Sequence, residues 1–214
     1  MANEYLLKEY ELCFEQLRFY DTRQESLLKY LCSLTAAVAT AQFAVYQLLH
    51  GATAVFLTCE GLLSGLVFIA TALLFIAMLQ NRLYFVFVAR QLNAIRGYLM
   101  KVAADGFEKN QMYTSTNFPA LKPLSVHTIQ LLGATLISSL FAGASAYGLF
   151  AFLSCKLNVV MAGAAFLLVF VVEAGGGMLH LHFQGRSTAD KAIHHGRDED
   201  RTAPPGQSAG ASTK

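Results

Sequence analysis

Charged residues are scarce in this chain: they make up 14% of its 214 residues, against roughly 25% in soluble domains. From Tyr30 to Asn81 there is no lysine and no arginine, and Glu60 is the only formal charge. A segment of this length and polarity is stable across a bilayer but not in water. The composition therefore excludes an ordinary soluble domain, and the net charge of +2 is too small to favour a nucleic-acid partner.

The chain also lacks the motifs that carry common chemistries. It has no nucleophile elbow, no phosphate-binding glycine loop, no zinc-peptidase motif and no pair of catalytic carboxylates. The histidines and the four cysteines show no spacing typical of metal ligands. We therefore expect no catalytic residue, no cofactor and no metal site.

What the chain does contain is four apolar segments, each long enough to cross a bilayer. They predict an all-α integral membrane protein with four transmembrane helices in two hairpins. The first hairpin covers residues 30–79, with spans at 30–49 and 52–79. The second covers residues 126–183, with spans at 126–154 and 157–179. Between the hairpins we expect a cytoplasmic loop at 105–125, and after them a disordered tail at 184–214.

Helical segments flank the first hairpin on both sides, at residues 1–29 and 80–104. Each carries apolar residues at alternating spacings of three and four, which is the pattern of a coiled-coil seam. The seam positions are Leu6, Tyr10, Cys13, Leu17, Tyr20 and Leu27 in the first segment and Phe85, Val88, Leu92, Ile95 and Leu99 in the second. In the first segment Gln24 occupies the remaining seam position, between Tyr20 and Leu27. We expect these extensions to form an antiparallel stalk, whose seams pair with each other or with neighbouring copies.

Basic residues are distributed asymmetrically along the chain. Apart from Lys156, every lysine and arginine lies in the N-terminal segment, in the segment between the hairpins or in the tail. By the positive-inside rule, both termini and the middle segment are cytoplasmic. The layout is similar in architecture to small bacterial membrane proteins, which favours a bacterial inner membrane or a plasma membrane.

Two carboxylates, Glu60 and Glu173, fall inside the apolar segments. Charged groups in a bilayer are costly, so such residues often mark a site, a water-filled cavity, a proton path or a contact between helices. The other reading is a carboxylate that reaches water at the membrane surface. Because sequence does not fix their depth, both readings stay open.

Small residues form three further candidate features of the spans. A GxxxG motif with Gly61 and Gly65, and a run of small residues in the third span at Ser138, Ala142 and Ala146, favour close helix packing. The packing is either within the chain or between subunits, and such motifs also arise by chance in apolar helices. Gly175, Gly176 and Gly177 mark either a hinge or a close contact near the cytoplasmic end of the fourth span.

These features predict an oligomeric four-span membrane protein whose partners are the bilayer and other copies of the chain. The stalk would mediate assembly or sense a cytosolic protein or ligand, and the assembly would form a pore or perturb the membrane. The alternative is a non-conducting scaffold that recruits a cytosolic partner. A small transporter or membrane enzyme is the third candidate.

Overall fold

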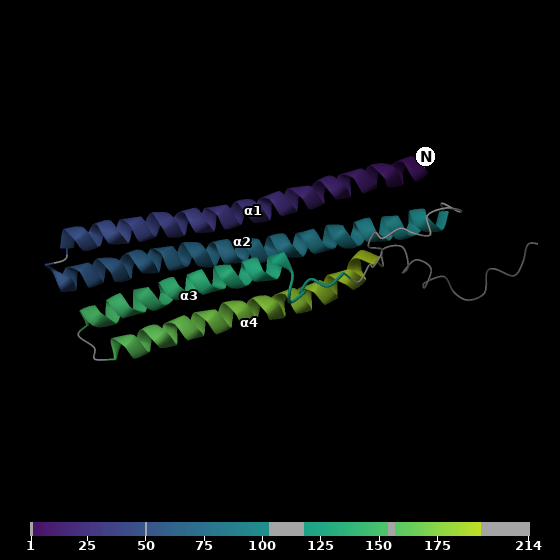
Figure 1. The fold of residues 1–214 in the computed structure, drawn as a ribbon. Helices are drawn as coiled ribbons and strands as arrows, with labels where there is room; N and C mark the ends of the chain where they lie inside the picture. The colour runs from purple at the N-terminus through teal and green to yellow at the C-terminus, as the bar shows by residue number, and fades with distance from the viewer. Residues whose placement is uncertain (1, 50, 103–117, 154–156, 194–214) are drawn as a thin grey trace, which may run out of the picture.

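In a computed structural model, the chain forms four α-helices: α1 (Ala2–Leu49), α2 (Thr53–Val102), α3 (Val126–Phe152) and α4 (Asn158–Ile193) (Figure 1). The structure describes residues 2–49, 51–102, 118–153 and 157–193, and within these ranges there is no strand. The prediction of an all-helical chain is confirmed. Most of the expected 105–125 loop, the turn around Cys155 and the tail from residue 194 lie outside the described residues.

The helix ends follow local sequence signals. Between α1 and α2 the backbone turns tightly, and the amide of Ala52 donates to the carbonyl of Leu49 at 2.8 Å. The start of α3 is capped by Ser125, whose hydroxyl accepts from the backbone amide of Thr128 at 3.3 Å. Pro123 lies two residues before this cap, where a proline cannot interrupt the helix.

The four helices lie side by side in chain order (Figure 1). Among the described residues, α1 packs mainly on α2, α2 on α3 and α3 on α4, whereas α1 and α4 do not contact each other. A closed four-helix bundle would bring its first and last helices together. The arrangement is therefore an open layer with α1 and α4 as its two edges.

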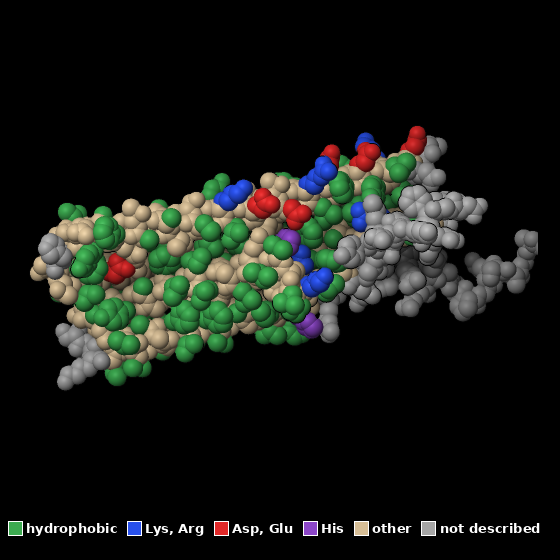
Figure 2. Space-filling view, viewed as in Figure 1, with side chains coloured by type: hydrophobic (Ala, Val, Ile, Leu, Met, Phe, Trp, Pro, Cys, Tyr) green, Lys and Arg blue, Asp and Glu red, His purple; other side chains and the backbone are tan. Residues whose placement is uncertain are grey.

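All four helices are long and apolar enough to span a membrane. Most residues in the apolar parts of these helices are not buried inside the protein. In the most apolar stretch of 18 residues, the buried share is 11% in α1, 33% in α2, 39% in α3 and 0% in α4. Acidic and basic side chains gather instead towards the end of the molecule where the N-terminus lies (Figure 2). An apolar exterior with charges collected at one end is what a bilayer-embedded protein requires.

Two apolar clusters hold the layer together. The larger one lies among all four helices and is built around Leu31, Met78, Leu83, Ala134 and Leu181. A smaller one joins the parts of α1 and α2 that precede and follow the apolar spans. We call it the seam cluster, and its members are Tyr10, Cys13, Leu17, Val88, Leu92, Ile95 and Leu99.

The fourth helix differs from expectation at its C-terminal end. Disorder was expected from residue 184, but α4 continues to Ile193. The stretch from Arg186 to Ile193 has no glycine and no proline, so nothing in it interrupts the helix. In addition, Gly185 is buried against Ala120, which fixes this part of α4 on the chain segment that leads into α3.

Candidate functional site

The two predicted seams face each other within one chain. Leu92 and Ile95 of α2 and Cys13 of α1 are nearly inaccessible, and four further members of the seam cluster pack around them. The other predicted seam positions lie elsewhere: Leu27 and Phe85 pack on the larger cluster, Leu6 is half-buried, and the ring of Tyr20 stacks on Tyr84 with centroids 6.0 Å apart. One chain therefore provides both halves of this seam.

Where the seam meets the apolar spans, two buried amides join α1 to α2. The Asn81 Nδ2 donates to the carbonyl of Tyr20 at 2.8 Å and to the Gln24 Oε1 at 3.0 Å. Both amide side chains are at most 2% exposed. Each leaves one polar atom without a partner, Asn81 Oδ1 and Gln24 Nε2, so this contact fixes one register of the two helices at some energetic cost.

Arg82, the next residue on α2, is 2% exposed and links three segments. Its Nε donates to the carbonyl of Ala120 at 3.2 Å, and its Nη1 lies 3.5 Å from the His127 Nδ1 on α3. The His127 Nε2 in turn lies 3.4 Å from a carboxylate oxygen of Asp21 on α1. A ring proton on Nε2 fits both contacts, since Nδ1 then accepts from Arg82 and Nε2 donates to Asp21.

The Arg82 guanidinium also lies over the rings of Phe85 and Phe118, with its central carbon 5.4 Å and 5.7 Å from their centroids. Arg82 follows the apolar span that ends at Leu79. Burial lowers its pKa to about 10, and the Asp21 carboxylate opposes this shift. The guanidinium therefore stays charged at neutral pH.

Two turns further along α2, Arg90 makes a second link of the same kind. Its Nε donates to the carbonyl of Phe118 at 2.9 Å, and its Nη1 donates to the carbonyl of Gly185 on α4 at 2.7 Å. We call the set Asp21, Gln24, Asn81, Arg82, Arg90 and His127 the junction. Through it, α1, α2, α3, α4 and the segment before α3 are tied together where the apolar spans end.

Sequence reasoning missed the junction. One signal was available, because Gln24 occupies a seam position where an apolar residue was expected. Nothing in the sequence showed that Asn81, Arg82 and His127 would meet it, because these residues come from three different helices.

Glu60, the first of the two carboxylates in the apolar segments, joins α2 to α1 through its side chain. Its Oε1 accepts from the Gln42 Nε2 at 2.5 Å and from the Ser64 hydroxyl at 3.4 Å. The Gln42 amide also donates to the Ser64 Oγ at 3.1 Å. The other oxygen of Glu60, Oε2, is buried without a partner.

The second carboxylate, Glu173, is bound in the same way between α3 and α4. Its Oε1 accepts from the hydroxyl of Ser138, which is fully buried, at 2.8 Å. Its Oε2 is also buried without a partner, and so is the Oγ1 of Thr135, one turn away on α3. Each carboxylate therefore joins neighbouring helices of one chain with a single oxygen.

The GxxxG glycines lie where α2 crosses α3. A Cβ at Gly61 would lie 3.0 Å from the backbone nitrogen of Leu149, and one at Gly148 would lie 2.5 Å from the carbonyl oxygen of Leu57. The Ser145 hydroxyl donates to the carbonyl of Gly61 at 2.9 Å and lies close to Gly65. In the predicted run of small residues on α3, Ser138 and Ala142 are buried and Ala146 is half-buried.

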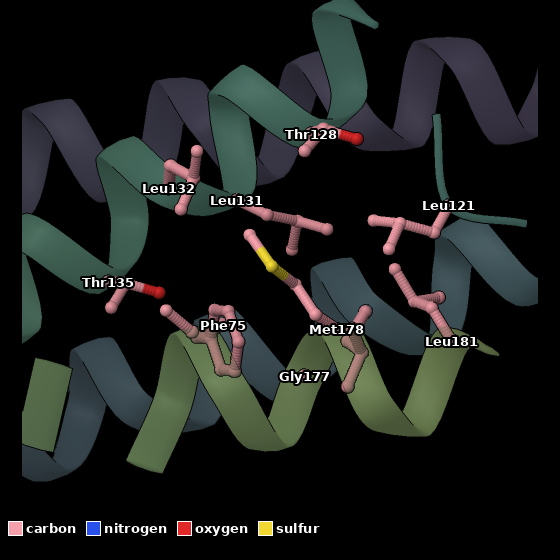
Figure 3. Close-up of a pocket in the computed structure, with 11 residues that line it drawn as sticks. Phe75, Leu121, Thr128, Leu131, Leu132, Thr135, Gly177, Met178 and Leu181 are labelled. Atoms are coloured by element: carbon pink, nitrogen blue, oxygen red, sulfur yellow. The ribbon is translucent and has the colours of Figure 1, made fainter. Parts of the chain in front are cut away.

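The three consecutive glycines lie inside an uninterrupted α4. Gly175 and Gly176 have open space where a Cβ would be, whereas a Cβ at Gly177 would lie 2.8 Å from the Phe75 ring. Gly177 also lines an apolar cavity among α2, α3 and α4, together with Phe75, Thr135, Met178 and Leu181 (Figure 3). Its empty volume is about 260 Å³ including the open mouth.

Within the described part of the chain, no three His, Cys, Asp or Glu side chains are grouped so that they could hold a metal ion. A comparison with protein-family models, with curated proteins and with solved structures finds no match to this chain. Among the described residues, the polar contacts of the junction join helices to one another.

Proposed function

We propose that the protein is an oligomeric integral membrane protein in which a two-helix cytoplasmic stalk brings copies together. The stalk consists of residues 3–29 and 83–102. The helix α1 continues from the stalk into the first span, and α2 continues from the second span back into the stalk, both without a break. Both termini are cytoplasmic. The apolar outward surface of the four helices supports insertion in a bilayer, such as a bacterial inner membrane or a plasma membrane.

The observation that carries the proposal is the junction. Arg82 and Arg90 bind carbonyl groups of the segment before α3 and of α4, and His127 bridges Arg82 and Asp21. A movement of α1 against α2 in the stalk would break the contact of Asp21 with His127 on α3. A movement of α2 itself would break the contacts of Arg82 and Arg90 with the segment before α3 and with α4. Through these contacts, assembly or ligand binding at the stalk would be transmitted to the spans.

A pore formed between copies is a second candidate function. It is favoured by Glu60 and Glu173, two carboxylates inside the apolar spans whose second oxygens have no partner. A non-conducting scaffold that recruits a cytosolic protein needs no polar group in the spans. Ion flux therefore separates these two candidates.

Two measurements test the proposal. The first is the mass of the purified protein in nanodiscs, for which we expect a defined multimer. The second is the labelling of single cysteines from outside intact cells: a cysteine at Gly51 should react and one at Glu11 should not, because the two lie at opposite ends of α1. A monomer, or the reverse labelling pattern, would contradict the proposal.

A further inference from the structure

One side of the stalk exposes a set of large apolar side chains. Tyr5, Leu12 and Phe19 of α1 are seven residues apart, and so are Tyr84 and Tyr98 of α2 on either side of Gln91. The five apolar side chains are between 46% and 68% exposed. We call these five residues, together with Gln91, the aromatic face.

Contacts between α1 and α2 show that both strips lie on the same side of the stalk. The Gln91 Nε2 donates to the Glu9 carboxylate at 2.6 Å, and the Tyr84 ring stacks on Tyr20, the neighbour of Phe19. Tyr5 and Leu12 lie about one turn before and after Glu9 on α1. The other side of α2 carries Arg82 and Arg90, which are bound to the segment before α3.

The α2 strip is unusually poor in charge for an exposed surface outside the apolar spans. Tyr84, Gln91, Ala94 and Tyr98 are exposed and uncharged. Phe87, which lies between them along the helix, is also uncharged but is half-buried against the larger apolar cluster. Of the basic residues in this part of α2, Arg90 and Arg96 are engaged elsewhere, Arg96 with the hydroxyl of Tyr10. Aromatic enrichment with depletion of charge is typical of the centre of a protein–protein interface.

We propose that a second copy of this chain binds to the aromatic face about a two-fold axis parallel to the stalk. This inference rests on the proposed function, because it names the surface through which copies assemble. Such an axis preserves height along the stalk and places α1 of each copy beside α2 of the other. The two stalks then form an antiparallel four-helix bundle.

The heights of the residues on the two strips match under this symmetry. The contacts of Tyr20 with Tyr84 and of Glu9 with Gln91 set the register of α1 against α2 within one chain. In that register Phe19 is level with Tyr84, Leu12 with Gln91 and Tyr5 with Tyr98. Across the axis, each side chain of the α1 strip therefore meets the side chain of the partner's α2 strip that lies at the same height along the stalk. Because the α2 strip is uncharged, this pairing brings no like charges together there.

The same side of α1 continues into the bilayer with small residues. Ser33 lies fourteen residues after Phe19, and Ser33, Ala37 and Ala41 are all exposed at four-residue spacing. Small residues allow close approach of helices in lipid. A partner that follows α1 from water into lipid must itself have a stalk and a span, which a copy of this chain provides and a soluble protein does not.

Cross-linking between two differently tagged versions of the full chain tests this arrangement. One version carries Leu12→Cys and the other Gln91→Cys, both in a background with Cys32→Ser, Cys59→Ser and Cys155→Ser. Oxidation in membranes should give a covalent dimer that contains both tags. The matched control replaces Leu12→Cys by Phe14→Cys, which lies on the other side of α1 and should give no such dimer.

The mass in nanodiscs provides the second measurement. Leu12→Glu combined with Phe19→Glu should abolish the two-fold contact, whereas Leu7→Glu, at an exposed position away from this face, should leave the wild-type mass. Changes at Leu17 or Leu92 are unsuitable here, because these residues pack within one chain and would disrupt the stalk itself.

The outcomes separate the two proposals. A wild-type multimer that gives no mixed cross-link and survives the double substitution would overturn the aromatic face as the interface and leave the proposed function standing. Cross-links only between two Leu12→Cys chains would overturn the two-fold pairing of α1 with α2. A wild-type monomer would overturn both proposals.

Discussion

The junction and the apolar spans satisfy their polar groups in different ways. At the junction, charged side chains bind carbonyl groups or one another across several segments, as Arg82 and Arg90 do. In the spans, Glu60 and Glu173 each use one oxygen, bound by neutral hydroxyl or amide groups. The comparison indicates that the junction fixes the arrangement of the helices, whereas the spans rely mainly on close packing.

The largest effect should come from breaking the junction at Arg82. In Arg82→Leu, the carbonyl of Ala120 and the ring of His127 lose a buried charged donor, so we expect stability to fall by about 3 kcal/mol. The measurement is thermal unfolding in detergent, followed by circular dichroism.

Arg23→Leu is the matched control, because it removes one positive charge near the same boundary from an exposed position. Its stability should stay within about 0.5 kcal/mol of wild type. Equal losses in the two variants would show that charge at the membrane surface matters and that the contacts of Arg82 do not.

A smaller loss is expected where the spans pack most closely. In Gly148→Ala, the new methyl group meets the backbone of Leu57 and Gly61, which has no room to give way without separating α2 from α3. We expect a cost of about 1 to 3 kcal/mol in the same unfolding measurement.

Gly133→Ala on the same helix is the control, because nothing lies within 4 Å of its new methyl group. It should be neutral, or stabilising by up to about 1 kcal/mol, since alanine favours the helix. If both substitutions destabilised the protein equally, close packing at Gly148 would not explain the loss.

The smallest effect on stability should come from Glu60→Gln. The glutamine carbonyl can still accept from Gln42 and Ser64, so the change in stability should be under about 1 kcal/mol. The same variant tests the second candidate function in liposome flux assays. Wild-type flux that the substitution changes would support a pore, and absence of flux in both proteins would leave the scaffold.

Much of the architecture could be predicted from the sequence because it depends on local composition. The segment from Tyr30 to Asn81, whose only charged residue is Glu60, must leave water, and the absence of proline within it allows continuous helices. The spacing of Leu92, Ile95 and Leu99 likewise predicts a seam, whatever it packs against.

Which residues meet across helices was decided only by the tertiary structure. Arg82 lies on α2 and His127 near the start of α3, far apart in the chain, yet the Arg82 Nη1 and the His127 Nδ1 are 3.5 Å apart. Glu60 is bound by Gln42, and Glu173 by Ser138, from positions far along the chain. Composition and periodicity report the environment that a residue prefers, whereas its partner depends on the register and order of the helices, which only their packing sets.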